Sequence, residues 1–148
     1  MGRGTYMKCF KALSLAAGLV AFAVGAAQSG TVKIIANSSV RADSISADEL
    51  KGVFLEHTNS LKDGSHVEPV LEKGGPTHEA FVRDYLEKSD AALQIYYRSL
   101  VFTGRGSMPK SVGSDAEVVT YVAKTKGAIG YVATGTSAAG VKTLEVKR

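Results

Sequence analysis

The sequence predicts a single α/β domain, in which a mixed sheet of about four strands is flanked by helices. Three observations lead to this prediction. β-Branched runs alternate with helical patterns along the chain, as in folds that layer helices on a sheet. Two predicted helix starts, at Ser46 and Ser114, carry a capping box. The composition, 45% hydrophobic and 22% charged over 148 residues, suits one globular domain.

Four segments are predicted as strands. Residues 31–36 form a β-branched run that ends at a polar turn, Asn37-Ser38-Ser39. Residues 67–71 form the second strand, and Pro69 within it suggests an edge position or an irregular pairing. Residues 128–132 and 141–146 close the sheet.

Four segments are predicted as helices. The first follows the Ser46 capping box, the second spans residues 77–87, and the third spans residues 90–102. The fourth follows the Ser114 capping box and ends before Gly127, a glycine that stops the helix. The residues expected in the core of this fold are Phe54, Phe81, Val119, Val122, Ile129 and Val132.

The first 30 residues do not belong to the predicted fold. A positive segment (Arg3, Lys8 and Lys11) precedes an uncharged apolar run at residues 12–27, which ends in small residues. This order is typical of a secretory signal peptide. We expect a signal peptide at residues 1–29, a domain at 30–148, and a periplasmic product. The apolar run is short for a membrane span, although an uncleaved anchor is the alternative, and either Met1 or Met7 can be the initiator.

Loss of this leader changes the charge of the protein. Of the 18 Lys and Arg residues, three leave with the leader, so 15 remain against 14 Asp and Glu and the net charge falls from +4 to about +1. No basic tract remains, which argues against a nucleic-acid partner. The only cysteine, Cys9, precedes the apolar run, so the mature chain makes no disulfide.

Signals for enzyme chemistry, metal binding and cofactors are missing from the sequence. The three histidines, His57, His66 and His78, are too far apart for a local metal motif, and no cysteine pair exists. No Gly-x-Ser-x-Gly elbow is present, and "GRGSMP" fails the dinucleotide-binding pattern. We therefore expect no catalytic residues, no metal and no cofactor.

Several motifs together resemble the phosphate ABC-transporter substrate-binding protein family. They are "ELKGVFLEHTNSLKDG", "YYRSLVFTGRG", "VVTYVAKTKGAIGYV" and "GVKTLEV", and the resemblance runs from Ile34 to Val146. Members of that family have two α/β lobes with the anion held in the cleft between them. The resemblance implies that this chain is a short relative with a single periplasmic-binding-protein-like lobe. It also implies phosphate or another small oxyanion as ligand, and a transporter or sensor as partner.

The phosphate loop of the family aligns with residues 72–78, Glu-Lys-Gly-Gly-Pro-Thr-His. The family's loop carries an arginine, an aspartate and a Ser-Gly-Thr run, and this chain lacks the arginine, the aspartate and the serine. Gly75, Thr77 and His78 remain as candidate ligand-binding residues, because backbone N–H groups at a helix start attract anions. Glu72 disfavours an anion there, and Lys73 or His78 can compensate in part. The alternative interpretation is an ordinary Gly-Pro turn with Thr77 as N-cap.

Three further residues are weaker candidates for the same ligand. Ser38 and Ser39 follow the first predicted strand, where the family's crossing strand reaches the cleft. Arg105 lies in a glycine-rich segment of locally positive charge. The alternatives are ordinary turn residues and a solvated loop.

Two functional classes therefore stay open. The first is a periplasmic solute-binding module that captures a small oxyanion. The second is an interaction module that keeps the fold, has lost the ligand shell, and docks on a membrane sensor, porin or transporter. Fold alone does not decide between them, because function depends on the site.

Overall fold

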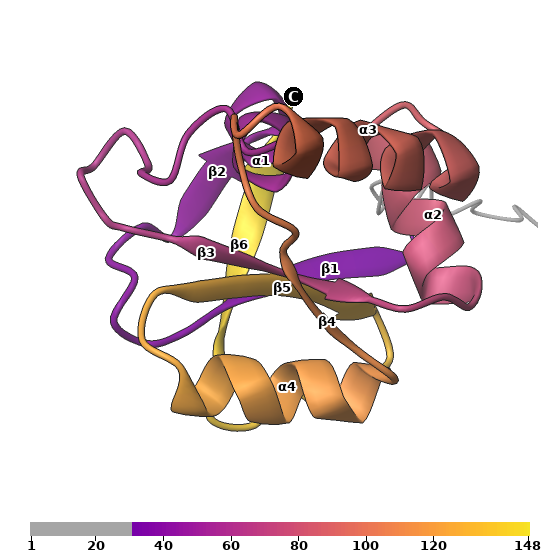
Figure 1. The fold of residues 1–148 in the computed structure, drawn as a ribbon. Coiled ribbons are helices and arrows are strands. Elements are labelled where there is room, and N and C mark those ends of the chain that lie inside the picture. The colour runs from indigo at the N-terminus through magenta and orange to yellow at the C-terminus, as the bar shows by residue number, and fades with distance from the viewer. Residues whose placement is uncertain (1–30) are drawn as a thin grey trace, which may run out of the picture.

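The computed structural model describes residues 31–148 as a six-stranded mixed sheet with helices on both faces (Figure 1). The predicted signal peptide lies outside the described residues. The elements, in chain order, are β1 (Val32–Ala36), β2 (Ser44–Ser46), α1 (Ala47–Phe54), β3 (Glu68–Glu72), α2 (Pro76–Tyr85), α3 (Asp90–Phe102), β4 (Lys110–Val112), α4 (Asp115–Lys124), β5 (Ala128–Ala133) and β6 (Lys142–Lys147).

The strands lie in the order β2-β6-β1-β5-β3-β4. β1 is antiparallel to both of its neighbours, β5 and β6. The outer pairs are parallel: β2 with β6, and β3 with both β5 and β4. The predicted α/β class and mixed sheet are confirmed.

Two strands are present that the sequence did not predict. β2 and β4 have three residues each, which is too short for an alternating pattern to be recognised. Because β4 forms one edge, β3 is an internal strand. Pro69 is nevertheless tolerated, since it aligns with Ile129 of β5 while the register with β4 begins only at Val70.

Of the four helices in residues 31–148, three begin with a serine cap. The hydroxyls of Ser46, Ser89 and Ser114 accept hydrogen bonds from backbone N–H groups three residues on, at 3.1, 3.1 and 3.2 Å. The predicted caps at Ser46 and Ser114 are confirmed. α2 differs, because its N-cap is Gly75 with φ at 98° and no side chain caps the helix. The expected cap at Thr77 is wrong, since Pro76 occupies the first helical position and Thr77 lies inside the first turn.

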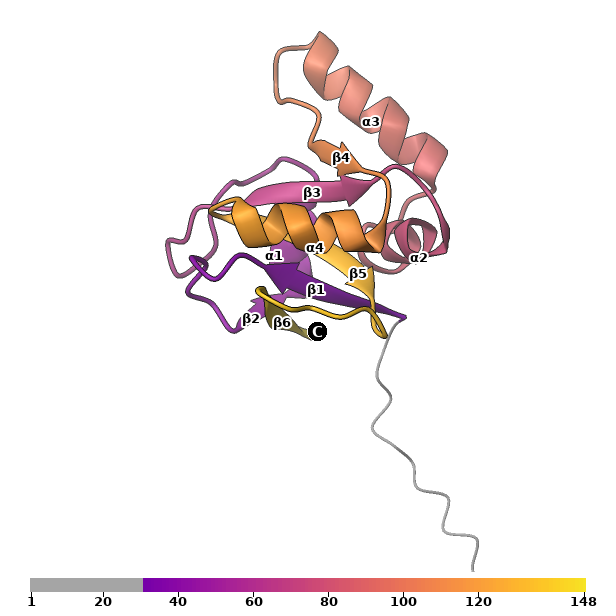
Figure 2. The same cartoon turned by 90° about the horizontal axis from the view of Figure 1, so that it is seen from below.

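The core has two layers, one on each face of the sheet. α4 covers one face, and α1, α2 and α3 cover the other, as Figures 1 and 2 show. Beneath α2, the ring of Phe81 stacks on Tyr131 with 3.9 Å between centroids. Of the predicted core residues, Phe54, Phe81, Val122, Ile129 and Val132 are buried.

Val119 was predicted in the core and is only partly buried. On α4, Val118 and Val122 point at the sheet instead, four residues apart on one helical face. Gly130 of β5 permits this close packing, because a Cβ there would lie 2.8 Å from Val118 Cγ1. Within residues 31–148, no helix has the length and apolar character needed to cross a membrane.

Candidate functional site

The carboxyl end of β3 meets the starts of α2 and α4. Glu72 is the last residue of β3, Thr77 lies in the first turn of α2, and Asp115 is the first residue of α4. The Glu72 and Asp115 carboxyl groups are hydrogen-bonded to each other, and the Thr77 side chain lies near enough to Asp115 to lower its pKa. The aligned phosphate loop is therefore built around two acidic side chains.

Asp115 is held as a carboxylate by several donors. Its Oδ2 accepts hydrogen bonds from the backbone N–H of Ala133 at 3.0 Å and from Thr136 Oγ1 at 2.8 Å. Partial burial alone would raise the pKa of Asp115, but its hydrogen bonds with Glu72, Ala133 and Thr136, with the nearby Thr77 adding to them, outweigh burial and lower it. Asp115 is therefore negatively charged at neutral pH.

Glu72 is a buried carboxyl group, only 5% exposed. Its Oε1 receives no hydrogen bond from any donor in the described part of the chain. Burial raises the pKa of Glu72 to about 8, and the hydrogen bond to Asp115 and the negative charge of Asp115 add to this effect. Glu72 therefore keeps its proton at neutral pH and can donate it to Asp115, so the Glu72/Asp115 pair carries one negative charge.

The start of α2 offers backbone donors next to this pair. The first N–H groups of a helix have no partner within the helix and attract anions. Gly75 provides no side chain to satisfy them. An oxyanion approaching these donors would, however, meet the Asp115 carboxylate, which Thr77 already contacts. The pair thus places a negative charge of the protein beside the start of α2, which disfavours an oxyanion there.

His78 is directed into the core and not toward a ligand at the helix start. It is 1% exposed, and both of its ring nitrogens are engaged. Nδ1 lies 2.5 Å from the Tyr131 hydroxyl, which also accepts the Glu72 backbone N–H at 2.8 Å, and Nε2 lies 2.8 Å from Asp90 Oδ1. Because the Asp90 carboxylate oxygen is an acceptor, Nε2 carries a proton that it donates to Asp90, while Nδ1 is hydrogen-bonded with the Tyr131 hydroxyl.

Ser38 and Ser39 lie at the other end of α4. The Ser39 hydroxyl accepts the Gly127 N–H at 2.9 Å, just beyond the end of α4. Ser38 is exposed in the same turn. Since α4 has ten residues, or about 15 Å at the α-helical rise, this turn is far from Asp115.

Arg105 occupies a third location, the turn that ends α3. Its backbone N–H donates to Leu100 O at 2.9 Å, and its side chain is exposed. The structure therefore groups Gly75, Thr77 and His78 on one helix, and places Ser38 and Ser39, and Arg105, elsewhere. Asp115 and Tyr131 complete the site and were not among the predicted site residues. For Asp115 the only sequence signal was its place in the Ser114 capping box.

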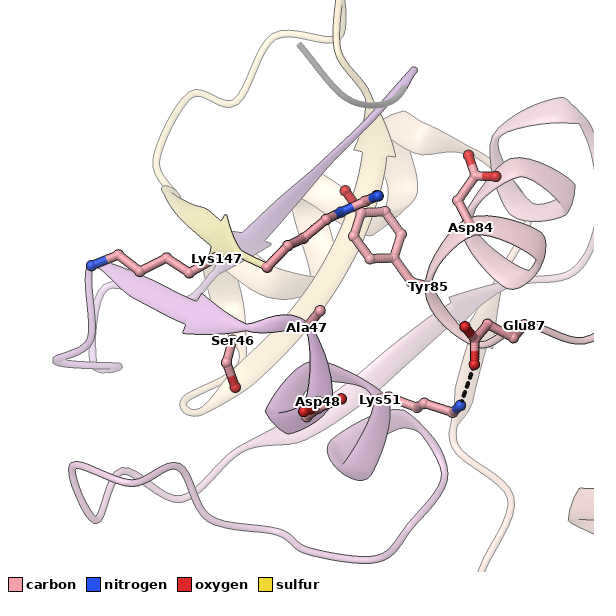
Figure 3. Close-up of a pocket in the computed structure, with 9 residues that line it drawn as sticks. Ser46, Ala47, Asp48, Lys51, Asp84, Tyr85, Glu87 and Lys147 are labelled. Atoms are coloured by element: carbon pink, nitrogen blue, oxygen red, sulfur yellow. Dashed lines mark hydrogen bonds and ion pairs between the residues drawn. The ribbon is translucent and has the colours of Figure 1, made fainter. Parts of the chain in front are cut away.

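A separate pocket of about 380 Å³ lies between the start of α1 and the end of α2 (Figure 3). An ion pair between Lys51 Nζ and Glu87 Oε2, 2.7 Å long, lies at its side. Its charged lining residues are balanced, three acidic and three basic: Asp48, Asp84, Glu87, Lys51, Lys147 and Arg148. Such a surface suits a polar protein segment better than a free oxyanion. Among residues 31–148, no group of three metal-ligating side chains gathers.

Comparisons with known proteins support the fold. No protein-family model and no curated protein matches the sequence. Solved structures do match: an ABC-type phosphate transport receptor from Vibrio cholerae has a TM-score of 0.54 at 13% identity, and PstS from Borrelia burgdorferi has 0.58 at 12%. The matches cover 79% and 80% of this chain but 46% and 47% of those chains, so this chain spans about half their length. The chain has the fold of part of the phosphate substrate-binding proteins.

Proposed function

We propose that this chain is an exported, solute-binding-protein-like module that docks on a partner protein and does not capture phosphate tightly. The observation that carries the proposal is the Glu72/Asp115 pair at the start of α2. Tight oxyanion sites supply several charge-assisted donors, whereas this pair supplies a net negative charge. The expected arginine is absent from the loop, and His78 is committed to Tyr131 and Asp90.

The proposed partner is a membrane transporter or sensor. The similar structures are a phosphate transport receptor and PstS, so a chain that keeps this fold can keep surfaces that contact transport machinery. The charge-balanced pocket of Figure 3 is a polar surface of this kind. It uses residues of α1, α2 and the end of the chain at β6, and none of the residues at the start of α2.

Weak oxyanion binding is the second candidate function. It is favoured by the one helix start in residues 31–148 that lacks a side-chain cap, at Gly75. The Thr77 and His78 backbone N–H groups lie there, and the helix dipole favours an anion. Without an arginine, we expect a dissociation constant on the order of millimolar, about −4 kcal/mol.

Isothermal titration with phosphate and sulfate tests whether the module captures an oxyanion tightly. For the wild-type protein we expect no binding tighter than about 1 mM. Asp115→Asn removes the negative charge and keeps an oxygen that can accept from Ala133 and Thr136, so it should strengthen oxyanion binding at least about tenfold. Glu79→Gln is the matched control, since it also removes one negative charge from the first turn of α2. Micromolar phosphate binding by the wild-type protein would overturn the proposed function.

Export is tested by the mass of the secreted product. If residues 1–29 are a signal peptide, cleavage between Ala26 and Gly30 should give a soluble periplasmic chain. Intact-mass analysis of the periplasmic fraction measures the cleavage site. Recovery of the full-length chain from membranes would support the uncleaved anchor instead.

A further inference from the structure

Two glutamates lie where the backbone favours glycine. Glu56 and Glu87 each follow the C-cap residue of a helix, α1 and α2 respectively, and have φ at 60° and 55°. Helices usually place glycine or asparagine at this position, because the left-handed backbone conformation is unfavourable for most residues with a Cβ. Within residues 31–148, no other residue except glycine has a positive φ. A contact of the carboxylate can offset the unfavourable backbone.

The two carboxylates differ in what they contact. Glu87 forms the ion pair with Lys51, 2.7 Å long. The Glu56 carboxylate has no hydrogen bond or ion pair within residues 31–148, and partial burial raises its pKa. A carboxylate that has lost part of its water and has no partner favours a positively charged group from outside the chain. The fold therefore accounts for Glu87 and leaves Glu56 without a partner.

Glu56 lines a pocket of about 350 Å³, which we call the Glu56 pocket. Pro69 and Pro109 also line it. β3 and β4 pair only from Val70 and Lys110 onward, one residue after each proline. Because proline has no N–H to donate to a neighbouring strand, the two prolines favour separate strands at this level, and the pocket lies where the strands separate. It is at the opposite end of β3 from the start of α2.

The lining of the Glu56 pocket suits an organic cation. Glu68 supplies a second carboxylate, whose Oε1 lies 3.8 Å from His66 Nε2. The Tyr121 ring supplies an aromatic face that already holds a cation, because Lys110 Nζ lies 5.7 Å from its centroid. Apart from His66, the charged lining residues are therefore two carboxylates and one ammonium. The uncharged lining residues are partly apolar and partly polar: Val67, Pro69, Met108 and Pro109, and Thr58, Asn59 and Ser107.

We propose that the Glu56 pocket binds a small primary amine in its ammonium form. The –NH3+ group pairs with the Glu56 carboxylate, and the alkyl part lies against Met108 and the two prolines. A volume of about 350 Å³ is at the small end of the range for ligand pockets, about 300–1,000 Å³. We therefore expect weak binding, with a dissociation constant on the order of millimolar. Neither oxyanion binding nor docking on a partner enters this inference.

NMR titration of the exported protein with n-butylammonium chloride tests the pocket. Backbone amide signals from residues 56–59, 66–68 and 107–108 should shift and saturate, with a midpoint on the order of millimolar. n-Butanol has the same alkyl chain without the charge, so it should bind at least about tenfold more weakly. Sodium chloride at the same concentrations controls for ionic strength. Shifts that do not saturate with n-butylammonium, or equal binding of n-butanol, would overturn the proposal.

Two matched variants separate a ligand contact from a structural role. Glu56→Asn and Glu87→Asn both place asparagine, which tolerates a positive φ, just after a helix. Glu56→Asn should bind n-butylammonium at least about tenfold more weakly, with a urea midpoint no lower than that of the wild type. Glu87→Asn should bind n-butylammonium as the wild type does, because the Glu87 carboxylate belongs to the ion pair with Lys51.

A third variant, Glu56→Gln, keeps the length of the side chain and removes only its charge. It should lose the same binding as Glu56→Asn. Equal binding by either Glu56 variant and the wild type would overturn the proposal, as would loss of binding in Glu87→Asn. A urea midpoint that falls in Glu56→Asn would show that the carboxylate serves the fold, which also overturns it.

Discussion

Replacing Glu72 with glutamine should stabilise the protein relative to the wild type, and this gain in the free energy of unfolding should increase as pH rises. The pKa of Glu72 is raised from 4.5 to about 8 in the folded protein by burial, with Asp115 adding to the effect. The wild type therefore loses stability as pH rises from about 4.5 to about 8, because only the unfolded chain releases this proton freely. Glutamine carries no such proton. At about 1.4 kcal/mol per pKa unit, the variant should gain about 2–5 kcal/mol over the wild type above pH 8, relative to their difference at low pH.

Urea denaturation at about pH 5 and about pH 8.5, on either side of most of this titration, measures the difference. Acidic groups that Glu72 does not contact titrate equally in both proteins, and Asp115, which it does contact, has a pKa lowered from 3.8 and so titrates below this pH range. Comparing the two proteins therefore isolates Glu72. Glu68→Gln is a matched control on the same strand, because Glu68 has a side chain that is 58% exposed. An identical pH dependence for wild type and Glu72→Gln would mean that Glu72 is ionised in the folded protein.

Gly127→Ala should destabilise the fold by about 2–4 kcal/mol, because the new side chain meets two penalties. Gly127 has φ at +79°, a conformation that costs a residue with a Cβ. A Cβ there would also lie 2.8 Å from the carbonyl oxygen of His66, a backbone atom that cannot rotate away. Gly127 also donates to Ser39 and accepts from the Glu68 N–H at 2.9 Å, so any shift disturbs both partners.

The control for Gly127→Ala is Gly135→Ala. A Cβ added at Gly135 would meet no heavy atom within 4 Å, and its φ is not positive. Alanine there should change stability by less than about 0.5 kcal/mol. Thermal or urea denaturation measures both variants. Equal stability of the two would show that the segment after α4 can relax.

Elements with strong local signals were predictable from the sequence. α3 has the predicted bounds, and the serine caps of α1 and α4 form as expected. The short edge strands β2 and β4 were missed, because three residues gain their strand conformation from their neighbours and not from their own pattern. Val119 was misplaced because consecutive valines fit two adjacent helical faces, and only packing on the sheet selects Val118.

The candidate site was only partly predictable. Glu72 was recognised as unfavourable for an anion, but its partner Asp115 lies far along the chain and reaches it only through the tertiary fold. From the sequence, His78 was expected to compensate in part for the negative charge of Glu72. In the structure it is fixed between Tyr131 and Asp90, which come from other elements. Long-range contacts of this kind leave no local signal.

The place of β1 in the sheet has a consequence for how the chain folds in time. β1 lies near the start of the described residues, whereas both strands that pair with it, β5 and β6, lie within residues 128–147. Sheet pairing across so large a sequence separation is slow and raises the contact order of the fold. β1 therefore stays unpaired until nearly all of the described chain has been synthesised. If the chain is exported as proposed, this delay keeps it incompletely folded during synthesis, and an incompletely folded chain is what a translocation channel accepts.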